Sequence, residues 1–517
     1  AADDAAAVRA GDMSGGWGAL TQAAAAGAAR LRAAWAAPEA AQRAALTALL
    51  RANAGTAFGR EHGFADIDDV AAFRRRVPIR DHDGHRRWID RVAAGEANVL
   101  TADPVLCLEE TSGATGAAKL IPYTQALLDD FRAAALPWLD AALAQGPQPP
   151  RGTLYVALSP ATRAARASAG GVPIGLLADA AYLGPQLGAA LLGLFAAPPE
   201  LGALADATAW RRATLAALVG RRDLAIVSIW SPTFFEALLD ALPQDAEALA
   251  PGLAPEPRAR LANALAGGRL DARALWPDLA LVSCWTDGPS AVFARRLAAR
   301  LPGVRLHPKG LLATEAAVTT PLRLDATQEA RVPALLGGFL EFIDEAGEAR
   351  GAHELAEGRA YRIVVTTSGG LSRYDLGDRV VCAGFAVAAG LRAPHLSFLG
   401  RERTSDLVGE KLSEVFAAQA LAALPVPAAL RPVHAPAPVY YTLLVEADDD
   451  AFAREGATWA ATVEARLAAN PHYAHARAMG QLAALRVEAV ARLADHHPRG
   501  EGRLAMVKPR ALLAMER

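Results

Sequence analysis

Residues 110–122, E-T-S-G-A-T-G-A-A-K-L-I-P, combine side chains suited to binding a phosphate group. They follow the apolar run 105–108, so we expect one strand to lead into a loop and a second strand to follow Lys119. Hydroxyl and backbone N–H groups of such a loop donate to phosphate oxygens, and a lysine adds positive charge. The residues expected to contact phosphate are Thr111, Ser112, Gly113, Thr115, Gly116 and Lys119.

The same residues also fit an ordinary polar turn, because clusters of Gly, Ser and Thr are common in loops. They do not form a Walker A loop, which requires Gly-Lys-Ser/Thr at the start of a helix. Here Lys119 follows Ala118 and precedes Leu-Ile-Pro, a strand-like sequence. Taken alone, this segment leaves a phosphate loop and a plain turn as equal alternatives.

A hydroxyl and a carboxylate, Thr314 and Glu315, follow the apolar run 304–307. This pair suits the α-phosphate of a nucleotide and a magnesium ion, since Mg²⁺ prefers one or two carboxylates together with phosphate oxygens. The alternative is that Thr314 caps the N-terminus of a helix.

Two further segments carry candidate site residues. Residues 369–378 contain Tyr374 and Asp378, and Asp378 on a tight Gly-Asp turn could accept two hydrogen bonds from a ribose diol. An ordinary turn has the same residues. Residues 506–510 contain Lys508, which a small C-terminal domain could bring to a site on a larger one, although terminal lysines are more often solvated.

The hydrophobic pattern predicts an α/β architecture with buried sheets. Helical spacing is present in residues 23–54 and 70–76, with a short helix at 88–94. Further along, strand-like runs alternate with helical patterns at 234–242, 258–266 and 290–301. The predicted strands are residues 154–158, 224–230, 279–284, 304–307, 339–343 and 361–366.

A change of composition after Leu399 predicts a second domain. We expect a large N-terminal domain at 13–400 and a smaller, mobile α+β domain at 401–517, with a hinge near 400–404. The small domain should contain helices at 414–424 and 458–469 and a strand at 439–445. Residues before Met13 are left out of this prediction.

Composition excludes several classes of protein. With 53 basic and 55 acidic residues, the balance argues against a nucleic-acid or membrane-surface binder. No signal peptide is recognised, and the apolar run 183–199 is interrupted by proline, glutamine and glycines. Three widely spaced cysteines predict buried thiols in a reducing compartment, so we expect a cytoplasmic protein. The histidine spacing predicts no metal site.

Together and in this order, the four segments resemble the auxin-responsive (Gretchen Hagen) family of acyl-acid amido synthetases, a branch of the adenylate-forming enzyme superfamily. S-G-A-T-G-A-A-K at 112–119 resembles the family's phosphate loop, and L-L-A-T-E at 311–315 its Tyr-x-x-Ser/Thr-Glu motif. Y-D-L-G-D at 374–378 is similar to Tyr-Arg-x-Gly-Asp, and M-V-K-P-R at 506–510 to Gln-x-Lys-x-Pro-Arg. The resemblance is good over residues 23–409 and looser beyond them.

The resemblance implies the fold of the adenylate-forming enzymes and a two-step, ATP-dependent reaction. A small carboxylic acid forms an acyl-adenylate and pyrophosphate, and an amine, typically of an amino acid, then takes the acyl group and releases AMP. The implied catalytic residues are Lys119, Glu315 as the Mg²⁺ ligand, and Lys508, with Lys411 as the rival to Lys508. The implied nucleotide contacts are Thr111, Ser112, Gly113, Thr115, Gly116, Thr314, Tyr374, Asp378 and Arg401. We expect a monomer or a weak homodimer.

An acid-binding pocket is predicted near Trp230 and Phe234, which suit an aromatic or apolar acid unless they are ordinary core residues. The chain also departs from the family in its motifs, and its C-terminal motif at 506–510 is one residue shorter than the family's. Ala114 replaces a hydroxyl residue, Leu311 an aromatic expected beside adenine, and Asp375 an arginine. Two alternative functions stay open. An adenylating synthetase that forms thioesters shares the first step, and a non-catalytic nucleotide or acid binder would have Ala114 and Leu311 as signs of lost activity. The sequence does not identify the acid or the amine.

Overall fold

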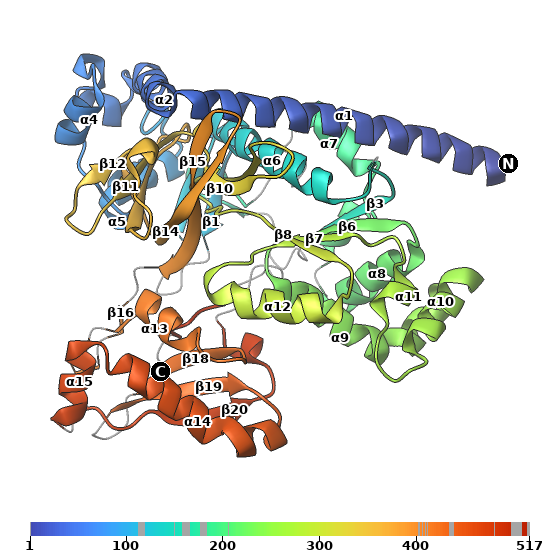
Figure 1. Cartoon of the computed structure of the whole chain (residues 1–517). Helices are drawn as coiled ribbons and strands as arrows, with labels where there is room; N and C mark the ends of the chain where they lie inside the picture. Colours follow the sequence, from blue (N-terminus) through green and yellow to red (C-terminus); the bar gives the residue numbers. More distant parts are fainter. Residues whose placement is uncertain are drawn as a thin grey trace.

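The computed structural model of the chain combines helices with several separate β-sheets (Figure 1). The described residues are 2–111, 119–148, 150–157, 166–175, 184–204, 206–401, 404–405, 407–408, 410, 412–433, 439–479, 481–497 and 509–513.

Two helices form the N-terminal region, α1 (Ala2–Ala36) and α2 (Pro38–Asn53). Pro38 begins α2, because the first helical position requires no N–H partner and suits the fixed φ of proline. α1 crosses α6 (Gln125–Gln145) so closely that a Cβ added at Gly27 would lie 2.4 Å from the Cβ of Leu136. The helices predicted within 23–54 are confirmed, and α1 also includes residues that precede Met13.

Three shorter helices follow, α3 (Ala57–Glu61), α4 (Val70–Arg76) and α5 (His82–Ala93). The prediction for α4 is confirmed. α5 starts earlier than predicted, because the Asp81 carboxylate accepts a hydrogen bond from the Gly84 N–H at 3.0 Å and so caps the helix.

The candidate phosphate loop lies in a β-hairpin. β1 (Cys107–Thr111) pairs antiparallel with β2 (Lys119–Tyr123), and Thr111 is opposite Lys119. The hairpin is extended by β5 (Pro173–Ile174) and β4 (Arg166–Ala167). The predicted strand before the loop and the predicted strand after it are both confirmed.

A four-stranded parallel sheet forms the next layer, in the order β3-β6-β7-β8. Its strands are β3 (Thr153–Val156), β6 (Leu224–Ser228), β7 (Leu281–Cys284) and β8 (Arg305–Pro308). The helices of this region are α7 (Gly184–Leu192), α8 (Ala207–Gly220), α9 (Pro232–Leu249), α10 (Pro255–Leu265), α11 (Ala272–Leu275) and α12 (Ala291–Arg300). The predicted strand–helix alternation and the α/β class are confirmed here.

A five-stranded antiparallel sheet was only partly predicted. Its order is β12-β11-β13-β14-β15. The strands are β11 (Phe339–Ile343), β12 (Ala349–Arg350), β13 (Ala360–Thr366), β14 (Tyr374–Ala388) and β15 (Leu391–Arg401). β11 and β13 match predicted strands, whereas the long β14–β15 hairpin was missed. The separate pair β9 (Thr319–Arg323) and β10 (Glu329–Pro333) is also antiparallel.

The C-terminal part, coloured orange to red in Figure 1, has a hydrophobic core of its own. It contains β16 (Thr404–Ser405), β17 (Leu412–Ser413), α13 (Glu414–Leu421), β18 (Ala428–Val433), β19 (Tyr440–Glu446), α14 (Asp449–Leu467), α15 (Pro471–Ala478) and β20 (Arg486–Val490). Its main sheet has the order β18-β19-β20. The exact domain boundary and the hinge stay predictions.

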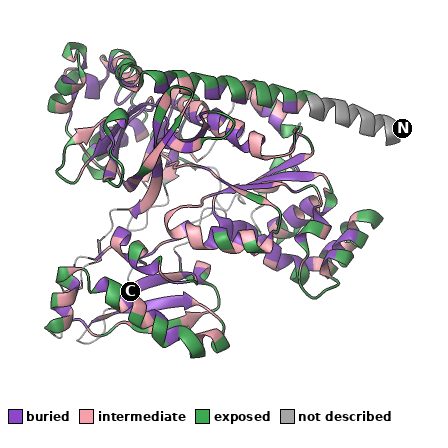
Figure 2. Cartoon of the chain, in the orientation of Figure 1, coloured by how far each residue is buried: buried purple, intermediate pink, exposed green. Residues whose placement is uncertain are grey.

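The strands of the central sheets are largely buried, and the outer faces of the helices are exposed (Figure 2). Among the described residues, no helix is long and apolar enough to cross a membrane. The three cysteines are buried thiols outside any disulfide, as their apolar surroundings in the sequence predicted.

Candidate active site

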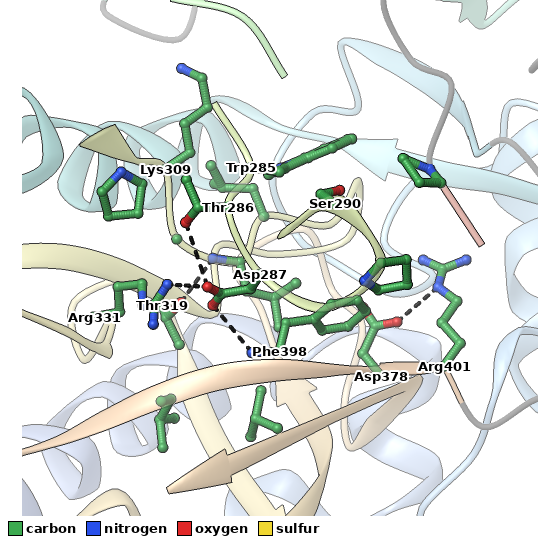
Figure 3. Close-up of a pocket in the computed structure, with 18 residues that line it drawn as sticks. Trp285, Thr286, Asp287, Ser290, Lys309, Thr319, Arg331, Asp378, Phe398 and Arg401 are labelled. Atoms are coloured by element: carbon green, nitrogen blue, oxygen red, sulfur yellow. Dashed lines mark hydrogen bonds and ion pairs between the residues drawn. The ribbon is translucent and has the colours of Figure 1, made fainter. Parts of the chain in front are cut away.

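A cavity lies where the ends of β7 and β8 meet the β14–β15 hairpin (Figure 3). Its empty volume, including the part open to solvent, is about 740 Å³. The lining residues are Trp285, Thr286, Asp287, Pro289, Ser290, residues 308–312, Thr319, Arg331, Asp378, Val380, Leu396, Phe398, Arg401 and Pro509. Residues from four distant parts of the chain therefore share one cavity.

One wall of the cavity is an ion pair between two of the predicted nucleotide contacts. Asp378 in β14 is directly opposite Arg401 in β15, and the Arg401 Nε donates to the Asp378 Oδ1 at 2.8 Å. The Asp378 side chain is only 3% exposed. The negative charge of Asp378, with that of Glu315, raises the pKa of Arg401, so this guanidinium is held in its charged form.

The tight turn predicted at Gly377-Asp378 is wrong, because both residues lie inside β14. The pairing of β13 with β14 shifts between Arg362 and Val364, and Gly377, opposite this irregularity, has φ +67°. A β-bulge that a glycine can accommodate thus replaces the turn. Bulges of this kind redirect side chains, and Asp378 immediately follows this one.

Glu315 is held behind the ion pair by Tyr374. The Tyr374 hydroxyl donates to the Glu315 Oε1 at 3.2 Å, and burial raises the pKa of Tyr374, so this hydroxyl keeps its proton. Tyr374 is 1% exposed, so it acts on the site through Glu315. The Thr314 carbonyl accepts a hydrogen bond from the Tyr123 hydroxyl at 2.7 Å. No helix starts at Thr314, which lies in the connection between β8 and β9, so the helix-cap alternative is wrong.

The predicted phosphate loop is only partly described. Lys119 is half-buried at the start of β2, while Ser112, Gly113, Thr115 and Gly116 lie outside the described residues. The buried His82 at the start of α5 is close to Lys119, since the lysine charge adds to burial in lowering the pKa of His82. The sequence analysis did not select His82, although Asp81 before it was a recognisable helix cap.

The C-terminal motif reaches the cavity through Pro509. The adjoining residues are anchored to the small domain, because the Leu430 N–H donates to the Ala511 carbonyl at 2.8 Å. Lys508 precedes Pro509 directly in the chain, but Lys508 and its rival Lys411 both lie outside the described residues.

The two residues predicted to bind the acid have different surroundings. Trp230 is 6.0 Å, between ring centroids, from the cavity-lining Trp285, and its ring lies 4.9 Å from the Lys309 Nζ. Phe234 is 5% exposed, packs against Trp210 in the core and does not line the cavity. The position of Trp230 is consistent with an adjoining acid pocket, whereas Phe234 is a core residue.

A polar group that the sequence analysis missed lines the opposite side of the cavity. Arg331 forms an ion pair with Asp287 (Figure 3). The Arg331 Nη2 also contacts the His395 Nε2 at 2.7 Å. Asp287 also accepts a hydrogen bond from the Phe398 N–H at 3.4 Å. The sequence did contain a signal for Asp287, since this residue follows a buried strand. Ligands bind at the edge of a sheet where the carboxyl ends of parallel strands meet, so polar residues after such strands are candidates for a site.

Two family models match the chain. The GH3 family N-terminal domain matches residues 27–255 and the GH3 family central domain matches residues 332–401, together more than half of the chain. The chain belongs to the GH3 family. The family predicted from the four motifs is therefore confirmed.

Individual relatives resemble this GH3 chain over shorter stretches. A probable indole-3-acetic acid-amido synthetase of Oryza sativa subsp. japonica, GH3.7, is 38% identical over 96 residues, 17% of this chain and 16% of the relative. The jasmonoyl–L-amino acid synthetase GH3.3 of the same organism is 38% identical over 89 residues, 17% of this chain and 19% of the relative. The matched segments thus span less than a third of these relatives.

Solved structures resemble the chain over nearly its whole length. The AtGH3.15 acyl acid amido synthetase in complex with 2,4-DB has a TM-score of 0.77 at 18% identity and covers 94% of this chain and 93% of its own. A 2-hydroxyisobutyryl-CoA ligase in its postadenylation state has a TM-score of 0.54 at 14% identity and covers 92% and 89%. The predicted fold of the adenylate-forming enzymes is confirmed.

The residues present fit a magnesium ion that is bound largely through substrate phosphates. The described residues contain no group of three or more histidine, cysteine or carboxylate side chains that could hold a metal alone. Mg²⁺ needs only one or two protein carboxylates when phosphate oxygens complete its shell. Glu315, with one oxygen fixed by Tyr374, can provide such a ligand.

An ionic and apolar contact holds the small domain against α12. The Arg296 Nε and Nη2 donate to Glu236 at 2.6 and 2.7 Å, and its Nη1 contacts Glu446 in β19. Next to this pair, Phe293 of α12 packs with four residues of the small domain, Ala429, Leu444, Leu493 and Leu513. This arrangement is the one in which Pro509 lines the cavity.

Replacing Glu446→Gln should weaken this domain arrangement. Loss of this partly exposed ion pair costs about 1 kcal/mol, a change of about fivefold in the population of the arrangement. Single-molecule energy transfer between dyes on α10 and α14 would measure the population. Glu488→Gln is the control, since Glu488 pairs with Arg431 inside the small domain. Identical distance distributions for the Glu446 variant and the wild type would contradict the prediction.

Proposed function

We propose that this GH3 chain is an ATP-dependent acyl-acid amido synthetase. The observation that carries the proposal is the pairing of the buried Asp378 with Arg401 in the wall of a cavity that the C-terminal motif also reaches. Relatives named as amido synthetases, and the fold shared with AtGH3.15, support it. ATP, Mg²⁺, a small carboxylic acid and an amino acid are the proposed substrates and cofactor.

Nucleotide binding follows from the charges in the cavity. Asp378 accepts one hydrogen bond from Arg401, and a carboxylate has further acceptor positions for the two ribose hydroxyls. Lys119 neutralises the outer phosphates, together with Thr111 and the loop hydroxyls. Bound Mg²⁺ supplies charge neutralisation at the phosphate oxygens. Glu315 is kept in position for this ion by the Tyr374 hydroxyl.

In the first step, a carboxylate oxygen of the acid attacks the α-phosphorus and pyrophosphate leaves. The contribution of the chain is to orient the reactants and to stabilise charge on phosphate oxygens, which is where such enzymes lower the barrier. Lys508 is proposed to act here, because its neighbour Pro509 lines the cavity.

In the second step, the amine attacks the acyl carbon, AMP leaves with the bonding electrons, and the amine loses a proton. We propose that the small domain rotates about residues 400–404 between the steps, as lids and mobile domains do in other enzymes. Rotation would separate Glu446 from Arg296 and withdraw the C-terminal motif. A cytoplasmic location and a monomer or weak homodimer complete the proposal.

Acid-dependent exchange of ATP with labelled pyrophosphate tests this function. The acid panel should include indole-3-acetic acid, jasmonic acid and 2,4-DB, taken from the relatives' names, together with short aliphatic acids. We expect exchange with at least one acid, and amide formation with AMP release when amino acids are added. Product formation with coenzyme A alone would favour the thioester alternative. Nucleotide binding without exchange for any acid would favour the non-catalytic one.

A further inference from the structure

The cavity has a large aromatic residue at the end of the parallel sheet. Trp285 directly follows β7, whose last residue, Cys284, is fully buried at 0% exposure, whereas Trp285 is partly exposed and lines the cavity. All four residues of β7 are buried, so the exposure begins only where the chain leaves the carboxyl end of the strand at Trp285. Figure 3 shows Trp285 and the Asp378–Arg401 pair in the same cavity.

The backbone of Trp285 is fixed. Its N–H donates to the Trp230 carbonyl at 2.8 Å, which extends the strand pairing of the sheet by one residue. The rings of Trp285 and Trp230 are 6.0 Å apart and inclined at 43°. A tryptophan anchored in this way offers a pre-positioned flat surface, so a ligand that stacks on it loses little side-chain entropy.

Several other lining side chains suit the flat face of a purine less well than an indole ring does. Asp287 and Arg331 form an ion pair with one another. The ring of Phe398, the second aromatic residue of the lining, packs on Gly288, where an added Cβ would lie 3.1 Å from its Cδ1. Leu311 is aliphatic and offers no aromatic surface.

We propose that Trp285 stacks on the purine base of the nucleotide and is the main source of base affinity. The inference deepens the proposed function, because it rests on the assignment of this cavity to a nucleotide. A purine is planar and apolar on its two faces, and base–aromatic stacking contributes substantially to binding without reading the edge of the base. The Asp378–Arg401 pair would then hold the ribose, while Trp285 holds the base.

Binding of AMP, measured by isothermal titration without acid or metal, tests the inference. Trp285→Ala should weaken AMP binding about 10-fold to 100-fold, and Trp285→Phe, which keeps an aromatic ring, should remain within a few fold of the wild type. Thermal melting of each free variant checks the fold. The phenylalanine variant gives a result even if the alanine variant is unstable.

A second substitution makes the test sharper. Since Leu311 lines the same cavity, adding Leu311→Tyr to Trp285→Ala should recover most of the lost AMP affinity by providing a new ring for the base. Recovery is not expected if Trp285 merely supports the sheet.

Two results would overturn the inference. One is AMP binding within twofold of the wild type for folded Trp285→Ala. The other is a change confined to the KM and size preference for the acid, which would make Trp285 a wall of the acid pocket beside Trp230. If AMP does not bind the wild type at all, the proposed function fails; if it binds both proteins equally, only the role of Trp285 fails.

Discussion

Asp378→Ala is expected to reduce kcat/KM for ATP in pyrophosphate exchange by about 10² to 10⁴. Two hydrogen bonds to a charged acceptor contribute about 3–6 kcal/mol at most, and each 1.4 kcal/mol corresponds to a factor of ten. The substitution also leaves the Arg401 guanidinium without the carboxylate that raises its pKa. Exchange at low ATP concentration, followed with the acid found for the wild type, is the measurement.

Asp375→Ala is the matched control for this experiment. Asp375 lies in the same strand and forms an ion pair with Arg362, but it does not line the cavity. We expect its loss to affect stability more than exchange. Near-normal exchange for the Asp378 variant, or an equal loss in both variants, would contradict the ribose assignment. Asp378→Asn separates the effect of charge from that of shape, since the amide oxygen can still accept from Arg401.

Lys508→Ala is expected to stop the first half-reaction and leave the second one intact. The physical reason is geometric, because a residue on a rotating domain meets the phosphates in only one of two orientations. ATP–pyrophosphate exchange should fall below detection. Conversion of a supplied acyl-adenylate and amine into amide should proceed at a rate close to that of the wild type. Both reactions are measured on the full chain.

Lys411→Ala is the companion variant, because Lys411 is the other lysine on the small-domain side of the predicted hinge that could serve the site. If the Lys411 variant loses exchange and the Lys508 variant does not, the two assignments are reversed. Loss of both half-reactions in the Lys508 variant would indicate a structural role for that residue. The melting temperature of each variant identifies this case directly.

Some helices and strands could be predicted from the sequence, because their residues follow a regular hydrophobic pattern. α4 and β11 follow the predicted ranges closely, since periodicity and helix caps act over a few residues. β14 and β15 were missed because irregularities interrupt their alternation. The register shifts at Arg379/Val380 and at Cys382/Gly384, where Gly384 has φ +143°, break the pattern that marks a strand.

The candidate site, like the fold, could be predicted only in part from the sequence. The sequence by itself determined the motif residues Glu315, Tyr374 and Asp378, and with the other motifs the family, because residue types at fixed spacing are a local property. Only the tertiary structure decided that Asp378 pairs with Arg401 and that the Tyr374 hydroxyl donates to Glu315. It also decided that Trp285 and Arg331 line the same cavity. These contacts join strands far apart in the chain, and their geometry depends on sheet register, on a bulge at Gly377 and on domain packing. No local pattern encodes those quantities, since each is set by the balance of packing over the whole fold.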